Sequence, residues 1–373
     1  MITIEAVTLT HIAMPLVTPF ETSFGRDVVR ETLIIELAAA AGSGWGQTVA
    51  FAAPGYSSET NDTCWAILSR YLIPALLAAP LTDLAELHHR WRWIRGHHMA
   101  RAGLEGAAAA LLAETAGQSL SAFLGGSRDR VPVGVSVGIQ ESPEALREVV
   151  AGFRVAGYAR IKLKIKPGKD VAYVAAVRAA FPDVALTADA NSAYTLADAD
   201  HLRELDAFGL TMIEQPLADS DIYEHSLLQR QLTTPICLDE SIHSLADAQA
   251  ALDLGSCGVI NIKVGRVGGL LPAQAIHDLC QARGIPVWCG GMLETGVGRA
   301  ANLAIASLPG FTLPGDISAS ARYFHQDIAA PAFLLNPDST ITVPTAPGLG
   351  VTVDRAALAA VTLHSQTWRR GAV

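Results

Sequence analysis

Residues 160–165 read Arg-Ile-Lys-Leu-Lys-Ile, a short run in which apolar and basic residues alternate. Alternation with a period of two is typical of a β-strand, and it places Lys162 and Lys164 on the same face of that strand. This run belongs to a series of short apolar runs that alternate with amphipathic segments of helix length. The runs cover residues 131–137, 160–165, 184–188, 210–213, 235–238, 258–262, 285–289 and 311–313.

Strand-like runs that alternate with helices predict a βα repeat. Eight repeats over about 190 residues suit a closed barrel, here residues 129–320, better than an open sheet. A doubly wound sheet stays open as an alternative, although the one dinucleotide-like string, Gly-Val-Gly-Arg-Ala-Ala at 296–301, is degenerate and comes late in the chain. Residues 1–128 mix strand and helix patterns and predict a separate α+β domain. Residues 321–373 return to strand and turn patterns and are expected to pack back on it.

The composition excludes several classes of protein. The chain has 36 acidic and 27 basic residues, a net charge of −9, which argues against a nucleic-acid partner. Half of the residues are hydrophobic and 17% are charged, so a large core is expected rather than disorder. No apolar run reaches the roughly 18 residues of a membrane span, and the first residues lack a signal-peptide pattern. The five scattered cysteines indicate reduced thiols, so we expect a cytoplasmic enzyme without a membrane partner.

Five consecutive runs end in an acidic residue or a lysine at an almost constant spacing. These residues are Lys164, Asp189, Glu214, Asp239 and Lys263, separated by 25, 25, 25 and 24 residues. One βα unit has this length, so in a barrel all five lie at the C-terminal rim of successive strands, where barrel active sites are built. A helix cap or a salt bridge would explain any one of them, but not the common spacing.

The three carboxylates predict a metal site. Acids on adjacent strands behind apolar residues would repel one another unless a cation neutralised them. Oxygen ligands without histidine or cysteine favour Mg²⁺ over zinc. Asp189, Glu214 and Asp239 are therefore the candidate ligands of Mg²⁺, for which Mn²⁺ can substitute.

The lysines predict the chemistry. A buried pair such as Lys162 and Lys164 is costly without an anion, and each is expected to lower the pKa of the other, which suits one of them as a base near neutral pH. Lys263 comes from a strand beyond the carboxylates, so a small carboxylate substrate chelated by the metal would meet a lysine on each face. Arg266 is expected either to lower the pKa of Lys263 further or to form a plain salt bridge. Such a site is suited to α-proton abstraction and to stabilisation of the resulting enediolate.

These residues resemble the enolase superfamily, whose sites use a Lys or His base with one or two Mg²⁺ ions. Within it, the Lys-x-Lys pair on the second barrel strand and the lysine on the sixth resemble the muconate-lactonising subgroup. Five strings narrow the resemblance to the o-succinylbenzoate synthase/N-succinylamino acid racemase family. They are PFETSFG (19–25), RIKLKIKPG (160–168), DANSAY (189–194), WCGGMLETGVGR (288–299) and LPGDISAS (313–320). The resemblance covers essentially the whole chain and implies a (β/α)7β barrel with an N-terminal capping domain that the C-terminal segment completes.

The resemblance also implies roles for individual residues. Asp189, Glu214 and Asp239 would bind Mg²⁺. Lys164 would remove the α-proton, and Lys263 would hold the enediolate in a synthase or act as the second base in a racemase. The residues expected to contact the substrate are Lys162, Ser136, Asn191, Phe20, Ser23, Gly291, Met292 and Leu293, with Asn261 and Arg266 as supporting polar groups.

Two departures from the family pattern bear on substrate details. Gln47 stands where relatives often have glutamate, and Ala113-Glu114 replaces a Trp-Asp pair. The activity implied first is a Mg²⁺-dependent o-succinylbenzoate synthase, which dehydrates 2-succinyl-6-hydroxy-2,4-cyclohexadiene-1-carboxylate in menaquinone biosynthesis and also racemises N-succinylamino acids. The alternatives are an N-acylamino acid racemase as the main role, a dipeptide epimerase or a cycloisomerase. A catalytically dead barrel that serves as a binding protein is an alternative of another class. A homo-oligomer is expected in each case.

Overall fold

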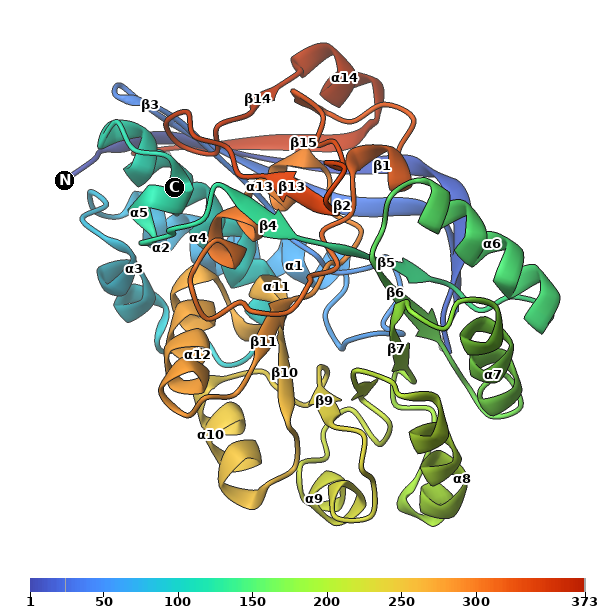
Figure 1. Cartoon of the computed structure of the whole chain (residues 1–373). Helices are drawn as coiled ribbons and strands as arrows, with labels where there is room; N and C mark the ends of the chain where they lie inside the picture. Colours follow the sequence, from blue (N-terminus) through green and yellow to red (C-terminus); the bar gives the residue numbers. More distant parts are fainter. Residues whose placement is uncertain (24, 372–373) are drawn as a thin grey trace.

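The computed structural model describes residues 1–23 and 25–371 and consists of a capping region above a barrel (Figure 1). A four-stranded sheet with the order β15-β1-β2-β3 forms the cap, and a curled seven-stranded sheet with the order β11-β10-β9-β8-β7-β6-β5 forms the barrel. The remaining strands form two small sheets of two strands each. Their members are β4 (Arg130–Pro132) with β13 (Thr340–Thr342) and β12 (Ala329–Ala330) with β14 (Thr352–Val353).

The capping sheet is built on a long hairpin. Its strands are β1 (Ile4–Glu21), β2 (Arg26–Ala39) and β3 (Gly42–Gln47). The first two are long because their antiparallel pairing continues to the pair Glu21–Arg26. The end of β1 reaches the barrel, where the amide of Ile139 donates to the carbonyl of Glu21 at 3.0 Å. The hairpin therefore extends from the cap to the barrel mouth.

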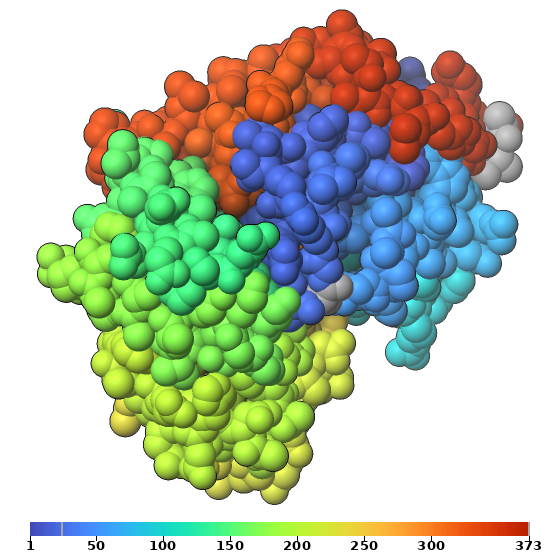
Figure 2. All heavy atoms as spheres, turned by 90° about the vertical axis from the view of Figure 1, so that its right-hand side faces the viewer, coloured from blue at the N-terminus to red at the C-terminus, as the bar shows by residue number. Residues whose placement is uncertain are grey.

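The C-terminal segment packs on the N-terminal strands, as the sequence predicts. Strand β15 (Thr362–Arg369) pairs antiparallel with β1 from Ala6–Arg369 to Ile12–Thr362. Helix α14 (Arg355–Ala360) precedes β15. In the space-filling view this segment, in red, lies directly above the blue N-terminal part of the chain, and the green part of the barrel lies beside and below the blue (Figure 2).

The helices of the cap follow its first three strands in the chain. They are α1 (Asn61–Ile67), the π-helical turn Leu68–Leu72, α2 (Ile73–Leu77), α3 (Leu84–Trp91), α4 (His98–Thr115) and α5 (Leu120–Phe123). Helix α4 is buried along most of its length and packs directly on β3. Two glycines permit this approach, because a Cβ at Gly44 or Gly46 would lie 2.1 Å or 2.2 Å from a backbone oxygen of α4.

The barrel sheet is parallel throughout, and each strand is followed by helix. The strands are β5 (Gly134–Val137), β6 (Arg160–Lys164), β7 (Ala185–Asp189), β8 (Ile213–Glu214), β9 (Ile236–Leu238), β10 (Val259–Ile262) and β11 (Val287–Cys289). The helices are α6 (Pro143–Val155), α7 (Val171–Ala180), α8 (Ala199–Arg203), α9 (Tyr223–Gln229), α10 (Leu245–Leu254), α11 (Val264–Val267), α12 (Leu270–Ala282) and α13 (Gly296–Ala306). Short 3₁₀ turns cover Leu196–Asp198, Glu204–Phe208 and Ser320–Arg322. This order confirms the predicted α/β barrel.

The eighth predicted strand, at residues 311–313, is wrong as a regular strand. Phe311 forms an isolated bridge to Val287 on β11, and Gly315 forms another to Val133 beside β5. The amide of Gly134 donates to the carbonyl of Gly315 at 2.8 Å. This segment contains Pro314, which cannot donate to a ladder, so single bridges rather than a strand join the two edges of the sheet.

Glu105 joins the cap to the barrel. It is fully buried in α4, and its carboxylate accepts hydrogen bonds from the amides of Leu270 and Leu271, the first residues of α12. We expect Glu105→Ala to lower the free energy of unfolding by about 3 kcal/mol, because it leaves buried amides of a helix terminus without an acceptor. Urea unfolding measures this loss. The exposed Glu114 of the same helix is the control, and Glu114→Ala should change stability by less than about 0.5 kcal/mol; equal losses would contradict the assigned role of Glu105.

Two expectations from composition concern the membrane and the cysteines. No helix in the part of the chain that the structure describes is long and apolar enough to cross a bilayer. All five cysteines are buried and have free thiols. Burial raises the pKa of Cys237 and Cys289 well above the usual value, which makes both thiols poor nucleophiles. The chemistry of the barrel therefore depends on its lysines and carboxylates.

Candidate active site

The strand register places the predicted residues at one end of the barrel. Lys164 pairs with Asp189 across β6 and β7, and Asp189 pairs with Glu214 across β7 and β8. Glu214 pairs with Cys237, so Asp239 lies two residues beyond that level. Lys263 directly follows β10. Each of the five residues therefore ends its strand or directly follows it, and all five lie at the C-terminal end of the parallel sheet, as their common spacing predicts.

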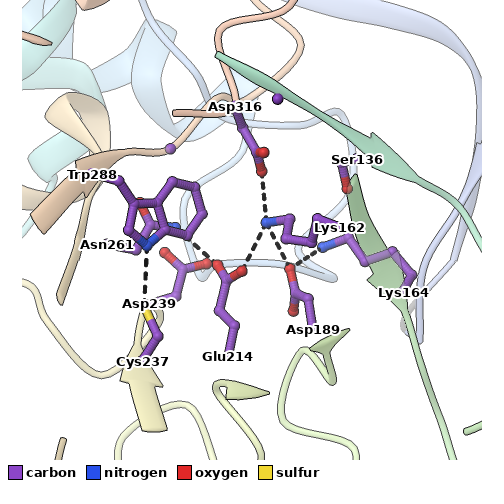
Figure 3. A network of polar contacts seen from close by, with 12 residues as sticks. Ser136, Lys162, Lys164, Asp189, Glu214, Cys237, Asp239, Asn261, Trp288 and Asp316 are labelled. Atoms are coloured by element: carbon purple, nitrogen blue, oxygen red, sulfur yellow. Dashed lines mark hydrogen bonds and ion pairs between the residues drawn. The ribbon is translucent and has the colours of Figure 1, made fainter. Parts of the chain in front are cut away.

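Lys162 lies at the centre of a buried ionic cluster (Figure 3). Its ammonium is 2.9 Å from Asp189, 2.8 Å from Glu214 and 2.6 Å from Asp316. The ring of Trp288 covers it, with the centroid 4.8 Å from the nitrogen. Burial alone would lower the pKa of Lys162, but the surrounding carboxylates raise it well above the usual value. The expectation that the lysine pair lowers its own pKa is wrong here, because Lys162 contacts carboxylates.

Asp316 and Trp288 were not selected from the sequence as site residues, although both lie within strings that carry the family resemblance. Asp316 also forms an ion pair with Arg160, whose guanidinium is 2.6 Å away. These two cations hold the pKa of Asp316 well below its usual range despite its burial. The sequence signals that could have identified Asp316 are its place in the string LPGDISAS and its position directly after the segment that closes the sheet.

Lys164 is held by two acceptors on neighbouring elements. Its ammonium donates to Asp189 Oδ2 and to Asn191 Oδ1, each at 2.6 Å. The amide nitrogen of Asn191 in turn donates to Glu240 Oε1 at 2.8 Å, which fixes the orientation of the amide. Burial and the adjacent Asp239 raise the pKa of Glu240 to about 7. Because an ammonium has three N–H groups, two are fixed by these acceptors and one direction remains for a reaction partner.

Lys263 is paired with Asp239, and a residue of the cap joins them. Lys263 Nζ is 2.7 Å from Asp239 Oδ2 and 3.0 Å from the hydroxyl of Tyr56. Arg266 also contacts Asp239. Burial alone would lower the pKa of Lys263, but Asp239 and Tyr56 outweigh it, and the pKa is raised. Arg266 acts in the opposite direction but is a minor contribution, so the salt bridge is the correct alternative and the expected net lowering is wrong.

The carboxylates were tested as holders of a divalent cation. Within residues 1–23 and 25–371, no three His, Cys, Asp or Glu side chains lie together in a ready metal-binding arrangement, because lysine and arginine groups pair with the carboxylates. The donor set nevertheless fits in chemistry and charge: Asp189, Glu214 and Asp239 are all at most 1% exposed and offer only oxygen. Burial and the neighbouring Asp189 raise the pKa of Glu214 to about 8. A divalent cation bound beside Glu214 would favour its charged form.

A pocket of about 500 Å³, counted out to its mouth, opens beside these groups. Its lining comprises Phe20, Thr22, Asp27, Phe51, Tyr56, Ser136, Lys162, Lys164, Asn191, Lys263, Gly291, Met292, Leu293, Asp316 and Tyr323. Most of the predicted substrate-contacting residues are in this list. Ser23 is not; its hydroxyl donates to the backbone carbonyl of Asn191 at 3.0 Å. Asn261 lies beneath the pocket and donates to Glu214 at 2.9 Å.

Gly290 permits the close packing of Lys263. A Cβ at this position would lie 2.3 Å from Asn261 Oδ1 and 2.8 Å from Lys263 Cε. We expect Gly290→Ala to displace the lysine and to lower kcat for the reaction by about 100-fold, since misplacement of a reacting group by about 1 Å can cost that much. Steady-state kinetics measures the effect. Gly152, in α6, has open space around its Cβ position and is the control; equal effects of the two alanine substitutions would contradict the role of Gly290.

The two departures from the family pattern lie in the cap. Gln47 Oε1 accepts from the amides of Thr295 and Gly298, each at 3.1 Å, and so binds the N-terminus of α13. An amide oxygen can accept there as a carboxylate would. Ala113 is buried and Glu114 is exposed in the last turn of α4. Neither departure lines the pocket.

The comparisons with known proteins agree with this geometry. Residues 145–357 match the family model described as "Enolase C-terminal domain-like", and residues 4–125 match "Mandelate racemase / muconate lactonizing enzyme, N-terminal domain". An o-succinylbenzoate synthase of Geobacillus kaustophilus is 52% identical over 372 residues, which is 100% of this chain and 99% of the relative. An N-succinylamino acid racemase of Amycolatopsis sp is 52% identical over 349 residues, 93% of this chain and 94% of the relative. The crystal structure of an enolase-superfamily member from Listeria innocua covers 100% of both chains with a TM-score of 0.95 at 42% identity.

A parallel barrel with lysines and carboxylates at its strand ends, beneath an α+β cap, defines a class of enzymes that form enediolates. The chain belongs to the enolase superfamily, in its mandelate racemase/muconate lactonizing enzyme group. Its similar relatives include both o-succinylbenzoate synthases and N-succinylamino acid racemases. Superfamily sites of this kind combine a Lys or His base with a divalent metal ion.

Proposed function

We propose that this protein is a Mg²⁺-dependent o-succinylbenzoate synthase that also racemises N-succinylamino acids. The observation that carries the proposal is the order of the strand ends: Lys164 on β6 and Lys263 after β10 flank the three carboxylates of β7, β8 and β9. A carboxylate substrate bound between them would meet one lysine on each face. A relative named as an o-succinylbenzoate synthase and another named as an N-succinylamino acid racemase are each 52% identical to this chain, which supports the dual assignment.

The metal site is part of this proposal. Asp189, Glu214 and Asp239 would hold Mg²⁺, for which Mn²⁺ can substitute. When bound, the ion supplies positive charge opposite the substrate carboxylate and so stabilises negative charge that develops on it. Lys162, already paired with carboxylates in the buried cluster, would contact that same substrate carboxylate.

The lysines would divide the proton transfers. Lys164 takes the α-proton from one face, and its two fixed hydrogen bonds direct its remaining position toward the pocket. In dehydration, Lys164 passes the proton that it has taken to the departing hydroxyl, which leaves as water as the ring becomes aromatic, while Lys263 stays protonated and holds the enediolate by charge. In racemisation, Lys263 delivers a proton to the opposite face of the α-carbon. One arrangement therefore serves both reactions.

The organisation and setting of the protein complete the proposal. The capping domain would comprise residues 1–128, the catalytic barrel residues 129–320 and the returning segment residues 321–373. The pairing of β15 with β1 supports this division. We further propose that the protein acts as a cytoplasmic homo-oligomer on a small carboxylate, without a nucleic-acid or membrane partner.

Paired assays on one Mg²⁺-loaded preparation test the function. One follows dehydration of the synthase substrate, and the other follows racemisation of an N-succinylamino acid, with α-deuterium exchange recorded in D₂O. A much higher kcat/KM for dehydration would establish the synthase as the main activity. Comparable or faster racemisation would make the alternative, an N-succinylamino acid racemase, the main activity. Absence of turnover and of exchange with both substrates would refute the proposal.

A further inference from the structure

Asp27 is a carboxylate of the pocket that the reaction does not use. It pairs with Phe20 in the β1–β2 ladder, and residues paired across an antiparallel ladder share a face of the sheet. Phe20 and Asp27 both line the pocket, whereas the next pair, Glu21 and Arg26, lines a separate groove on the other face. The register and the lining thus agree that Asp27 faces the substrate.

The Asp27 side chain has no direct partner among residues 1–23 and 25–371: it makes no hydrogen bond and no ion pair there. The nearby cation, Arg30, uses its guanidinium to donate to the carbonyls of Val49 and Ala50 at 2.7 Å and 2.9 Å. Arg30 therefore offers Asp27 charge at a distance but no contact. A half-buried carboxylate without a contact partner is open to a cationic group of a ligand.

The remainder of the pocket suits an aliphatic chain that carries such a cation. Apolar and aromatic side chains line it, among them Phe51, Leu293 and Tyr323. The pocket lysines are already matched by carboxylates, as Lys162 is by three and Lys263 by Asp239. Asp27 is thus the pocket carboxylate that can pair with a positively charged group of the substrate.

We infer that the site prefers N-succinylamino acids with a cationic side chain, lysine or arginine, whose charged end binds Asp27. This inference rests on the proposed racemase activity and specifies its substrate class. The apolar wall would cover the methylene stem of the side chain, and the lysines and carboxylates of the barrel would hold the α-carboxylate end.

Calorimetric binding to the Mg²⁺-loaded protein tests the inference without turnover. N-succinyl-L-lysine and N-succinyl-L-norleucine have side chains that differ by the terminal amine. We expect the lysine compound to bind about tenfold more tightly, as one half-buried charge pair allows, and Asp27→Asn to reduce that ratio to about one. The control is Glu21→Gln on the opposite face of the same hairpin, beside Lys166, which should keep the ratio.

The outcomes separate this inference from the proposed function. A ratio near one in the unmodified protein, a ratio unchanged by Asp27→Asn, or no binding of either compound would overturn the inference. α-Deuterium exchange of the same two compounds reports on racemisation independently. A lysine preference in binding without exchange would support the role of Asp27 and refute the racemase activity.

Discussion

Lys164→Ala is expected to lower kcat/KM by at least about 10³-fold for both dehydration and racemisation. Both reactions begin with removal of the α-proton, and a positioned general base contributes about 10²–10⁴-fold to such a step. The loss should lie in kcat rather than in KM. Lys162, which would contact the substrate carboxylate, and the three carboxylates, which would hold the metal ion, remain in this variant. Steady-state kinetics with both substrates measures the effect, and the thermal unfolding midpoint verifies that the variant folds.

Lys166 provides a matched control for this prediction. It lies two residues further along the same string, is partly exposed, and its ammonium is 3.5 Å from Glu21 at the surface. Lys166→Ala should change kcat/KM by less than about threefold, since a surface ion pair contributes at most about 1 kcal/mol. Retained turnover in Lys164→Ala would remove Lys164 from the mechanism.

Asp239→Asn is expected to weaken Mg²⁺ binding by at least about 100-fold, because it removes one of three negatively charged ligands. The same change leaves Lys263 and Arg266 without the carboxylate that they share. Since removal of one partner from a buried ion pair costs about 3–5 kcal/mol, the metal-free variant should also be less stable by about that amount. Calorimetric titration with Mg²⁺ measures the first effect, and urea unfolding measures the second.

A control variant at an exposed aspartate distinguishes the loss of a metal ligand from the loss of one negative charge anywhere on the protein. Asp253 pairs with Arg283 at 2.6 Å, and both side chains are solvent-accessible. Asp253→Asn should leave Mg²⁺ affinity unchanged and alter stability by less than about 1 kcal/mol. Unchanged metal affinity in Asp239→Asn would move the ligand assignment to other residues, whereas lost affinity without lost stability would show that Lys263 and Arg266 find other partners.

The barrel and its strand-end residues could be predicted because their signals are local. Lys164, Asp189 and Glu214 lie one βα unit apart, and parallel strands in register bring such positions to one level of the sheet. The failure at residues 311–313 has a local cause as well. An apolar run predicts burial, but Pro314 directly after it cannot donate a hydrogen bond to a ladder.

The pKa expectations failed for a different reason. From the sequence, the neighbours of Lys162 and Lys263 were other cations, namely Lys164 and Arg266. In the structure each lysine contacts carboxylates, which raise its pKa despite burial. The sign of a pKa shift depends on which charges are nearest in space, and for a buried group those charges come from distant strands.

The sequence by itself determined the fold class, the spacing of the five strand-end residues and the reaction class that they define. Periodicity carries this information, because each βα unit repeats the same geometry. Only the tertiary structure decided which groups complete the site: Tyr56 and Asp27 from the cap, and Asp316, Trp288 and Glu240 from the barrel. Most of these groups reach the site from segments far apart in the chain. A buried lysine requires neighbours that neutralise its charge, cover it or fix its orientation, and only folding determines which side chains lie within contact distance.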